Sequence, residues 1–477
     1  MKSIPSAGRR TALVAALLGW MFDGLEIGLF PLVARPALRD LLQAGAPESL
    51  VGLWFGIITA GFLVGAAAGG VLFGRLGDRI GRVRAMTLSV LVYAGCSGLG
   101  GLAQTPQQLA ALRFLGALGM GGEWALGVAL VMELYADKSR GVLAAWIGAA
   151  GNLGYGLVAL IYFAINRLPQ LEGTGTANWR LLMLAGALPA AFTLFLRFFV
   201  PESPKWEAER DRGAASQWSP WDLAWVLFGT AVACGMVAVW ALPVHRFWQF
   251  AALVPGVGVS AWAMLQPTRH FLIRSGTEET ARRRITGRML LGAGLAGVPL
   301  LGTWAGVMWQ YNFVDRLTGG TNPDARPTVM LASSLGAAAG SFLLALLGDR
   351  FGRRILYAIA CIISMFTLYG FYTYNTVYGP LFVAGSFALG FVCASFYGWL
   401  PLYLPELFPT AIRATAQGFA YNFGRIIAAV GALQMTAILA AFDDDYSRAC
   451  AVSAGIFLMG LVLITVAPET LGEELPS

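Results

Sequence analysis

Long apolar stretches separated by short polar segments dominate this chain of 477 residues. A helix of about 20 apolar residues is long enough to cross the hydrocarbon layer of a bilayer, which is roughly 30 Å thick. Stretches of this length recur fourteen times, which predicts an all-α integral membrane protein. They form a first set of six, a central pair and a second set of six, near residues 11–34, 51–73, 83–103, 107–135, 142–165 and 180–200; 221–242 and 247–265; and 289–313, 328–348, 355–375, 380–404, 412–441 and 447–467.

A six-residue motif links two spans in each set of six. Gly77-Asp78-Arg79-Ile80-Gly81-Arg82 recurs 271 residues later as Gly348-Asp349-Arg350-Phe351-Gly352-Arg353. Two further motifs repeat in the same order with offsets of 273 and 267: Glu133 and Arg140 with Glu406 and Arg413, and Pro201-Glu202-Ser203 with Pro468-Glu469-Thr470. This repetition predicts two pseudo-symmetric six-helix bundles that face a central cavity, an architecture of secondary transporters. We expect bundles at 1–205 and 288–477, joined by a linker (206–287) with two extra transmembrane helices and a basic cytoplasmic segment.

Charge sets the expected location and orientation. Charged residues make up 12% of the chain, against about 25% in soluble proteins. Most of the 33 Lys and Arg fall in alternate loops, and such loops face the cytoplasm. We therefore expect a multi-pass protein of the cell (inner) membrane with both termini in the cytoplasm. A single extra span would invert the second bundle, so the central pair must cross together or not at all.

Several classes of function are excluded by what the chain lacks. The net charge of +7 comes from scattered loops and does not indicate nucleic acid as a partner. Five Cys and two His show neither a disulfide framework nor a metal spacing, and no Walker-type loop occurs. We expect no enzyme, no metal and no cofactor. The expected partners are the lipid bilayer, a small-molecule solute and protons, with the chain as a monomer.

The loop Gly74-Arg75-Leu76-Gly77-Asp78-Arg79-Ile80-Gly81-Arg82 resembles the signature of the major facilitator superfamily. Gly121-Gly122-Glu123-Trp124 and Phe22-Asp23-Gly24-Leu25-Glu26 are most similar to its metabolite:proton and sialate:proton symporters, whereas Pro201-Glu202-Ser203-Pro204 resembles its sugar porters. The resemblance implies that a network of loop charges braces the cytoplasmic side as a gate. Positive-inside anchoring is the alternative, but it does not explain the two Asp. The gate candidates are Asp78, Arg79, Arg82, Glu133, Arg140, Asp349, Arg350, Arg353, Glu406 and Arg413.

Four charged residues lie at lipid depth in the first and fourth spans. A charge there is costly unless it faces a partner or a wet cavity. With a rise of about 1.5 Å per residue, Glu26 and Arg113 reach nearly the same depth from opposite sides, so they can pair. The resemblance implies that this pair couples protons, and a static link between helices is the alternative. Asp23 either shares the site or supports it, and Glu123, too far from Arg113 to pair, is a second proton station or a structural bond.

Arg425 is the leading candidate for substrate contact. It lies deep in the span at 412–441, with no acidic residue within one turn. A buried guanidinium without a local partner can bind a carboxylate through two hydrogen bonds; the alternative is a bond to helix carbonyls or to an acid on another helix. Further polar side chains either line the same cavity or join helices: Asn152, Tyr155, Gln310, Asn312, Tyr421 and Asn422. Close helix packing is expected at glycines 61, 65, 69, 336 and 340.

These features predict a secondary active transporter that moves a small organic acid by alternating access, as a proton-coupled symporter. A sugar or polyol porter is the alternative within the superfamily, because the chain has many tryptophans that can stack on sugar rings. A transporter-like solute receptor is the alternative of another class.

Overall fold

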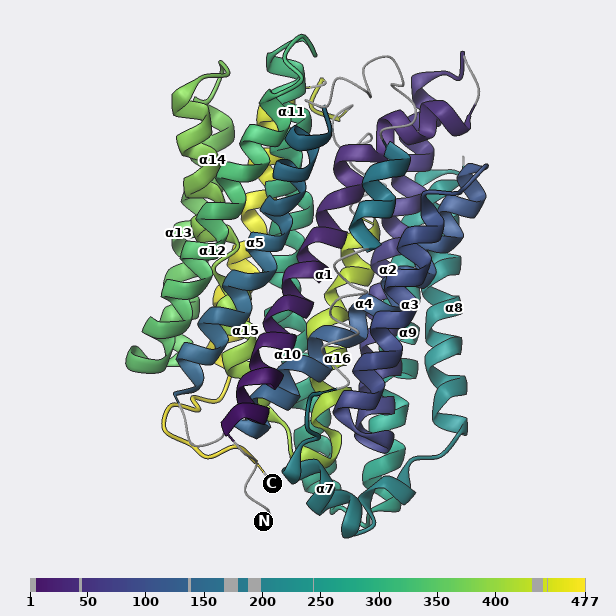
Figure 1. Ribbon diagram of the computed structural model, residues 1–477, viewed down its shortest axis with the longest axis vertical. Coiled ribbons are helices and arrows are strands. Elements are labelled where there is room, and N and C mark those ends of the chain that lie inside the picture. The colour runs from purple at the N-terminus through teal and green to yellow at the C-terminus, as the bar shows by residue number, and fades with distance from the viewer. Residues whose placement is uncertain are drawn as a thin grey trace.

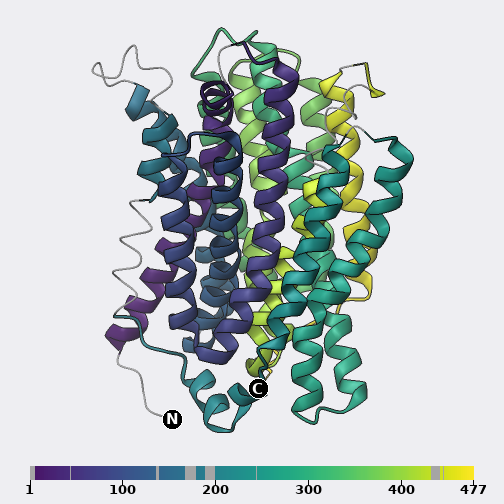
Figure 2. The ribbon, with the colours of Figure 1, turned by 90° about the vertical axis from the view of Figure 1, so that its right-hand side faces the viewer.

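The computed structural model describes residues 6–42, 45–135, 139–166, 179–187, 199–242, 244–430, 441–443 and 445–476. These residues form helices and connecting turns, without strands. The long helices run side by side along the longest axis of the molecule, and both chain ends lie at the same end of the bundle (Figures 1 and 2). We call this end the terminal end, and the opposite one the far end.

The described helices form two groups with a hairpin between them. The first half contains α1 (Ser6–Leu41), α2 (Glu48–Ile80), α3 (Arg82–Gly100), α4 (Pro106–Leu134), α5 (Arg140–Asn166) and the short α7 (Pro204–Asp211). The hairpin consists of α8 (Trp221–Ala241) and α9 (Arg246–Arg274). The second half contains α10 (Glu279–Ala305), α11 (Gln310–Leu317), α12 (Ala325–Phe351), α13 (Arg353–Tyr374), α14 (Pro380–Cys393), α15 (Phe396–Tyr403), α16 (Arg413–Asn422), α18 (Tyr446–Val452) and α19 (Ile456–Thr465).

Twelve helices in the described ranges are long and apolar enough to cross a membrane. They include α8 and α9 and match twelve of the fourteen expected spans. The other two expected spans, 180–200 and 412–441, include residues 188–198 and 431–440, which lie outside the described part of the chain. Fourteen crossings therefore remain a prediction.

Glycine turns close the repeated loops. Gly81 and Gly352 end α2 and α12 with φ angles of 109° and 103°. Side chains with a Cβ rarely adopt this left-handed region, so the second glycine of each motif is explained by backbone geometry. Between α2 and α3, and between α12 and α13, the chain reverses within one residue, which places the charged side chains of both motifs at helix ends.

Close glycine contacts hold helix pairs together in both halves. A Cβ built on Gly65 or Gly69 of α2 would lie 2.5 or 1.9 Å from a carbonyl oxygen of α4, and one on Gly336 or Gly340 of α12 would lie 2.0 or 1.8 Å from one of α14. These four positions agree with the expected role. For Gly61 the expectation was wrong, since nothing lies within 4 Å of its added Cβ.

The substitution Gly69→Ala is expected to destabilise the protein strongly, because the new methyl group would overlap the Leu118 carbonyl oxygen. Overpacking costs about 1–3 kcal/mol, and more where backbone must move. Gly61→Ala is the matched control on the same helix and should be neutral or slightly stabilising. Thermal unfolding in detergent measures both; equal melting temperatures for the two variants would contradict this account.

The hairpin is tied to the first half by a buried acid that sequence reasoning missed. Asp222, at the start of α8, accepts hydrogen bonds from Ser219 N (2.8 Å) and Arg274 Nη2 (2.7 Å). Arg75 of α2 lies 3.9 Å from the same carboxylate and also donates to the Ser219 carbonyl. Arg75 thus contacts the start of α8, and Asp222 also holds Arg274 at the end of α9, so the hairpin is attached to α2 at the terminal end.

Candidate functional site: a central cavity between two ion networks

A central cavity lies between the two halves. It encloses about 1030 Å³ of space outside protein atoms, including its opening. The first half contributes side chains from α1, α4 and α5, and the second half from α10, α12 and the segment that contains Arg425. Four of the expected polar residues line it together with Arg425: Asn152, Tyr155, Tyr421 and Asn422.

Arg425 is buried in the cavity wall, with 4% of its surface exposed. Its guanidinium carbon lies 5.6 Å from the centre of the Tyr421 ring. Within the described part of the chain, Nε and Nη1 have no hydrogen-bond partner. A buried donor without an acceptor is costly, so these two nitrogens are unsatisfied donors in the cavity wall.

Seven aromatic side chains line the cavity, and sequence reasoning did not single out five of them as cavity residues. They are Trp20, Trp124, Trp304, Tyr311 and Tyr397, in addition to Tyr155 and Tyr421. Trp124 of α4 stacks on Tyr421 of α16 with ring centres 3.7 Å apart and an angle of 7°. This stack joins the two halves beside Arg425. Flat apolar faces of this kind bind flat ring or conjugated systems well.

Two expected cavity residues lie elsewhere. Gln310 is fully buried and donates to Ser333 Oγ (3.1 Å) instead of lining the central cavity. Asn312 lines two other cavities, which lie nearer the far end than the central cavity does. The reason is a break in the helix: α10 ends at Ala305, a 3₁₀ turn follows at Val307–Trp309, and α11 starts at Gln310. A helical period counted through residues 289–313 therefore assigns the wrong face after the break.

The structure brings Glu26 and Arg113 into contact, as their depths in the membrane suggested. Arg113 Nη1 donates to Glu26 Oε1, and Ser97 donates to the other carboxylate oxygen. Each of the two charged residues has 3% of its surface exposed. The guanidinium carbon also lies 4.7 Å from the centre of the Phe62 ring and 5.3 Å from that of Phe30. The pair is thus enclosed by apolar rings, where charge changes have large energetic effects.

The other two acids of this region have different surroundings. Asp23 lines the central cavity on α1 and has 8% of its surface exposed. Glu123 of α4 is fully buried and is not part of the cavity lining. Asp23 therefore belongs to the cavity wall, whereas Glu123 does not.

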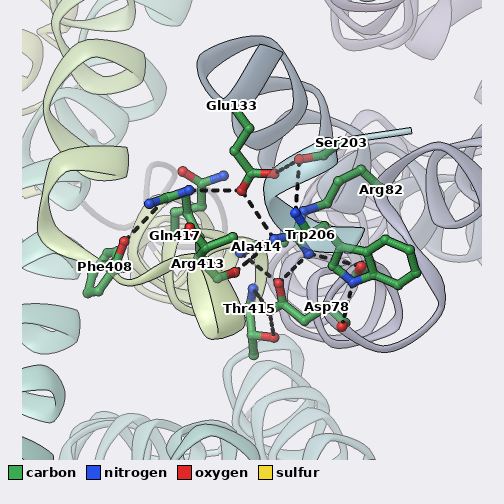
Figure 3. Close-up of polar contacts among 12 residues, drawn as sticks. Asp78, Arg82, Glu133, Ser203, Trp206, Phe408, Arg413, Ala414, Thr415 and Gln417 are labelled. Atoms are coloured by element: carbon green, nitrogen blue, oxygen red, sulfur yellow. Dashed lines mark hydrogen bonds and ion pairs between the residues drawn. The ribbon is translucent and has the colours of Figure 1, made fainter. Parts of the chain in front are cut away.

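At the terminal end, a buried ion network joins the two halves (Figure 3). Arg82 donates to Asp78 (2.5 Å) and to Glu133 (3.2 Å) within the first half. Arg413 of the second half donates to the same Glu133 oxygen (2.9 Å). Asp78 in turn accepts from the backbone and hydroxyl of Thr415, at 2.8 and 2.5 Å. One acid of the first half thus holds an arginine from each half.

The second copy of the motifs makes a corresponding set of contacts. Arg353 donates to Asp349 (3.2 Å) and Glu406 (2.8 Å), and Arg140 of the first half donates to the same Glu406 oxygen (2.5 Å). Asp349 accepts from the backbone of Gly141 in the first half (3.2 Å). Each half therefore supplies an arginine to the acid of the other half.

Arg79 and Arg350 lie outside these networks, and their expected membership of the gate is corrected. Both side chains are exposed, because each follows the Asp that takes part in the network and so points away from the helix contact. Arg350 stacks on Phe351, 5.3 Å from the ring centre.

Ser203 and Thr470, which sequence reasoning did not place in the gate, donate to Glu133 and Glu406. The repeat of their motifs, Pro-Glu-Ser and Pro-Glu-Thr, could have indicated that these two hydroxyl groups belong to the networks.

The glutamates of these two motifs cap helices. Glu202 accepts from the backbone of Arg82 and Val83, and Glu469 from that of Arg353 and Arg354. Burial raises the pKa of Glu202 above its ordinary value, because the backbone donors do not offset its desolvation. Burial also opposes ionisation of Glu469, but its backbone hydrogen bonds outweigh this and lower its pKa.

The cavities continue from the central one toward the far end. An intermediate cavity shares Ile27, Trp304, Met308 and Tyr311 with the central cavity and includes Arg113. An outer cavity shares Asn312 and Arg326 with the intermediate one. Tyr155 and Met308 are in contact between the central and intermediate spaces, with the hydroxyl 3.1 Å from the sulfur. The described structure thus has a row of cavities toward the far end and ion networks at the terminal end.

Known proteins resemble this chain over nearly its whole length. The niacin transporter NiaP of Acinetobacter baylyi is 25% identical over 479 residues, covering 98% of this chain and 95% of the relative. The cis,cis-muconate transport protein of the same organism is 26% identical, covering 88% and 85%. The sialic acid transporter NanX of Escherichia coli is 23% identical, covering 87% and 84%.

Solved structures share the fold. The proton:xylose symporter XylE bound to 6-bromo-6-deoxy-D-glucose superimposes with a TM-score of 0.70, at 21% identity and covering 99% of this chain and 98% of the other. The TM-score falls to 0.59 for XylE in an inward-open conformation.

Two family profiles match the chain. Residues 11–219 match the profile described as "Sugar (and other) transporter", and residues 320–476 match the profile of the Major Facilitator Superfamily. The members of this family are multi-pass membrane transporters, not enzymes. With its helical fold, its two profile matches and its full-length relatives, this chain belongs to the major facilitator superfamily.

Proposed function

We propose that this chain is a secondary active transporter that moves a small organic acid together with protons by alternating access. The observation that carries the proposal is Arg425, which lines the central cavity and has two buried nitrogens without a hydrogen-bond partner among the described residues. A planar guanidinium matches a carboxylate in geometry and charge. Among the relatives, muconate and sialic acid are acids by name.

The aromatic wall favours a flat solute. Trp124 and Tyr421 present stacked rings beside Arg425. Tyr155 and Tyr311, whose ring centres lie 6.4 Å apart, line the same cavity. A conjugated or ring-bearing carboxylate would bind Arg425 with its charged end and the aromatic rings with its body. Asp23, in the same cavity, would repel a second negative charge unless it is protonated.

The ion networks support a gate at the terminal end. We infer that the two bundles, residues 1–205 and 288–477, move about the central cavity, and that the terminal end faces the cytoplasm. The inter-half pairs Arg413–Glu133 and Arg140–Glu406 hold this end closed. They must separate when the solute leaves on that side, because both networks span the two halves.

A sugar or polyol porter is the second candidate. It is supported by the match of residues 11–219 to the "Sugar (and other) transporter" profile and by the tryptophans of the cavity wall. A sugar would leave the Arg425 nitrogens facing hydroxyl groups instead of a carboxylate. The two candidates therefore differ in their dependence on the charge of Arg425.

Arg425→Gln is expected to weaken binding of an organic acid by about 10–100-fold, since a hydrogen bond to a charged group contributes about 1.5–3 kcal/mol. Arg425→Lys keeps the charge but loses the planar fork, so it should weaken binding less. Tryptophan fluorescence of the purified protein, titrated with niacin, cis,cis-muconate, sialic acid and xylose, measures this. Arg79→Gln, an exposed arginine outside the networks, is the control. Binding of xylose alone, unaffected by Arg425→Gln, would favour the sugar porter.

A further inference from the structure

A second group of cations surrounds the outer cavity at the far end. This cavity is lined by Arg35 of α1, by Asp315 and Arg316 of α11, and by Arg326 at the start of α12. Asp315 pairs with Arg326, and Arg35 is an exposed guanidinium of the same lining. A cleft lined by one sign of charge raises the local concentration of counter-ions.

Arg326 lies at the inner limit of this cavity. It lines both the outer and the intermediate cavity. Its Nη1 donates to Asp315 at 3.1 Å, and 17% of its side chain is exposed. Its Nε is buried and has no hydrogen-bond partner in the described structure. Asp315 thus accepts from one nitrogen of the guanidinium, and the buried Nε lacks an acceptor among the described residues.

The other cation on the inward route is already engaged. Arg113 lines the intermediate cavity but is paired with Glu26 and enclosed by Phe30 and Phe62. Of the two arginines that line the intermediate cavity, Arg326 is therefore the one that can accept an incoming carboxylate without breaking the Glu26 pair. Six of the thirteen residues that line the intermediate cavity are aromatic, and their rings would accommodate a flat apolar body.

We propose that Arg326, assisted by Arg35, forms an entry subsite that binds the carboxylate of the solute before it reaches Arg425. This inference rests on the proposed function, because it requires an anionic solute. Asp315 competes with the solute for Arg326, so the subsite binds weakly and releases its carboxylate inward. The subsite raises the capture rate at low solute concentration without setting the turnover rate.

Arg326→Gln tests the subsite in proteoliposomes, with the probe acid chosen by its binding from niacin, cis,cis-muconate and sialic acid. The KM for uptake should rise about tenfold at low ionic strength, within the range of electrostatic steering. The maximal rate should change less than twofold, and added salt should raise KM less than in the unmodified protein. Arg39→Gln is the matched control, since Arg39 is an exposed α1 arginine paired with Glu48 and outside the cavity lining.

Asp315→Asn keeps the test decisive if Arg326→Gln does not fold. Removal of the competing carboxylate should lower KM severalfold, and an unchanged KM would overturn the subsite. A KM within twofold of the original in Arg326→Gln, with the same salt dependence, would also overturn it. Equilibrium binding separates the two proposals: if Arg425→Gln binds the acids normally, or none of the three acids binds, the proposed function fails and the entry subsite fails with it. Loss of binding in Arg425→Gln with a normal KM in Arg326→Gln rejects the subsite alone.

Discussion

Glu133→Gln is expected to open the terminal end of the transporter. The carboxylate of Glu133 holds Arg82 from its own half and Arg413 from the other, and all three residues are nearly or completely buried. Breaking a buried ion pair costs about 3–5 kcal/mol when one charge is left uncompensated. Arg413 regains water only when the halves separate at this end. The equilibrium should therefore shift toward that conformation by a factor on the order of 10² or more.

Spin labels at Arg84→Cys and Ile355→Cys can measure this shift. The two positions are equivalent in the repeated motifs, follow the buried arginines, and are exposed in different halves. In Glu133→Gln the distance distribution should move to longer values. Arg79→Gln is the matched control, because this arginine belongs to the same loop but lies outside the network. A folded Glu133→Gln protein with an unchanged distribution would show that the network does not hold the terminal end closed.

The repeated motifs predicted which residues form the networks better than how they pair. The offsets matched Glu133 with Glu406 and Arg140 with Arg413, but the exchange of arginines between halves depends on how the bundles dock. No property of a single loop encodes that docking. Asp78 and Asp349 were informative because an acid in a positively charged loop needs a specific partner.

The cavity wall was predictable only where side chains are polar. Asn152 and Arg425 stand out in apolar spans because burying them is costly. Trp20, Trp304 and Tyr397 do not, since an aromatic side chain is equally suited to lipid, to a helix contact or to a solute. Gln310 shows the opposite error: it is polar, but the helix break before it turned its side chain toward Ser333.

The Glu26–Arg113 contact was predictable because two lengths, the helical rise and the thickness of the bilayer, nearly determine depth in a membrane. Depth alone leaves the rotation of each helix open. The energetic cost of an unpaired ion at this depth supplied the remaining information. The same argument correctly placed Glu123 away from Arg113, and left its partner undetermined.

Glu26→Gln is expected to abolish proton-driven accumulation of solute. Glutamine has nearly the same shape as glutamate and can keep the hydrogen bond with Ser97, but it cannot change charge. If protonation of Glu26 releases Arg113, the variant fixes the released arrangement. One coupled proton supports about tenfold accumulation per pH unit, since one unit corresponds to 1.36 kcal/mol. Under an inward gradient of one unit, the variant should equilibrate the solute without concentrating it.

Proteoliposome uptake with and without the gradient distinguishes coupling from a static link. A static link predicts loss of stability in Glu26→Gln with accumulation intact, whereas coupling predicts intact solute exchange with no accumulation. Glu48→Gln is the matched control, because its carboxylate pairs with Arg39 at the surface and is 59% exposed. The substitution Asp23→Asn then determines the role of the second acid on α1. Lost accumulation with normal exchange would place Asp23 in the proton path, whereas weakened binding alone would make it part of the solute site.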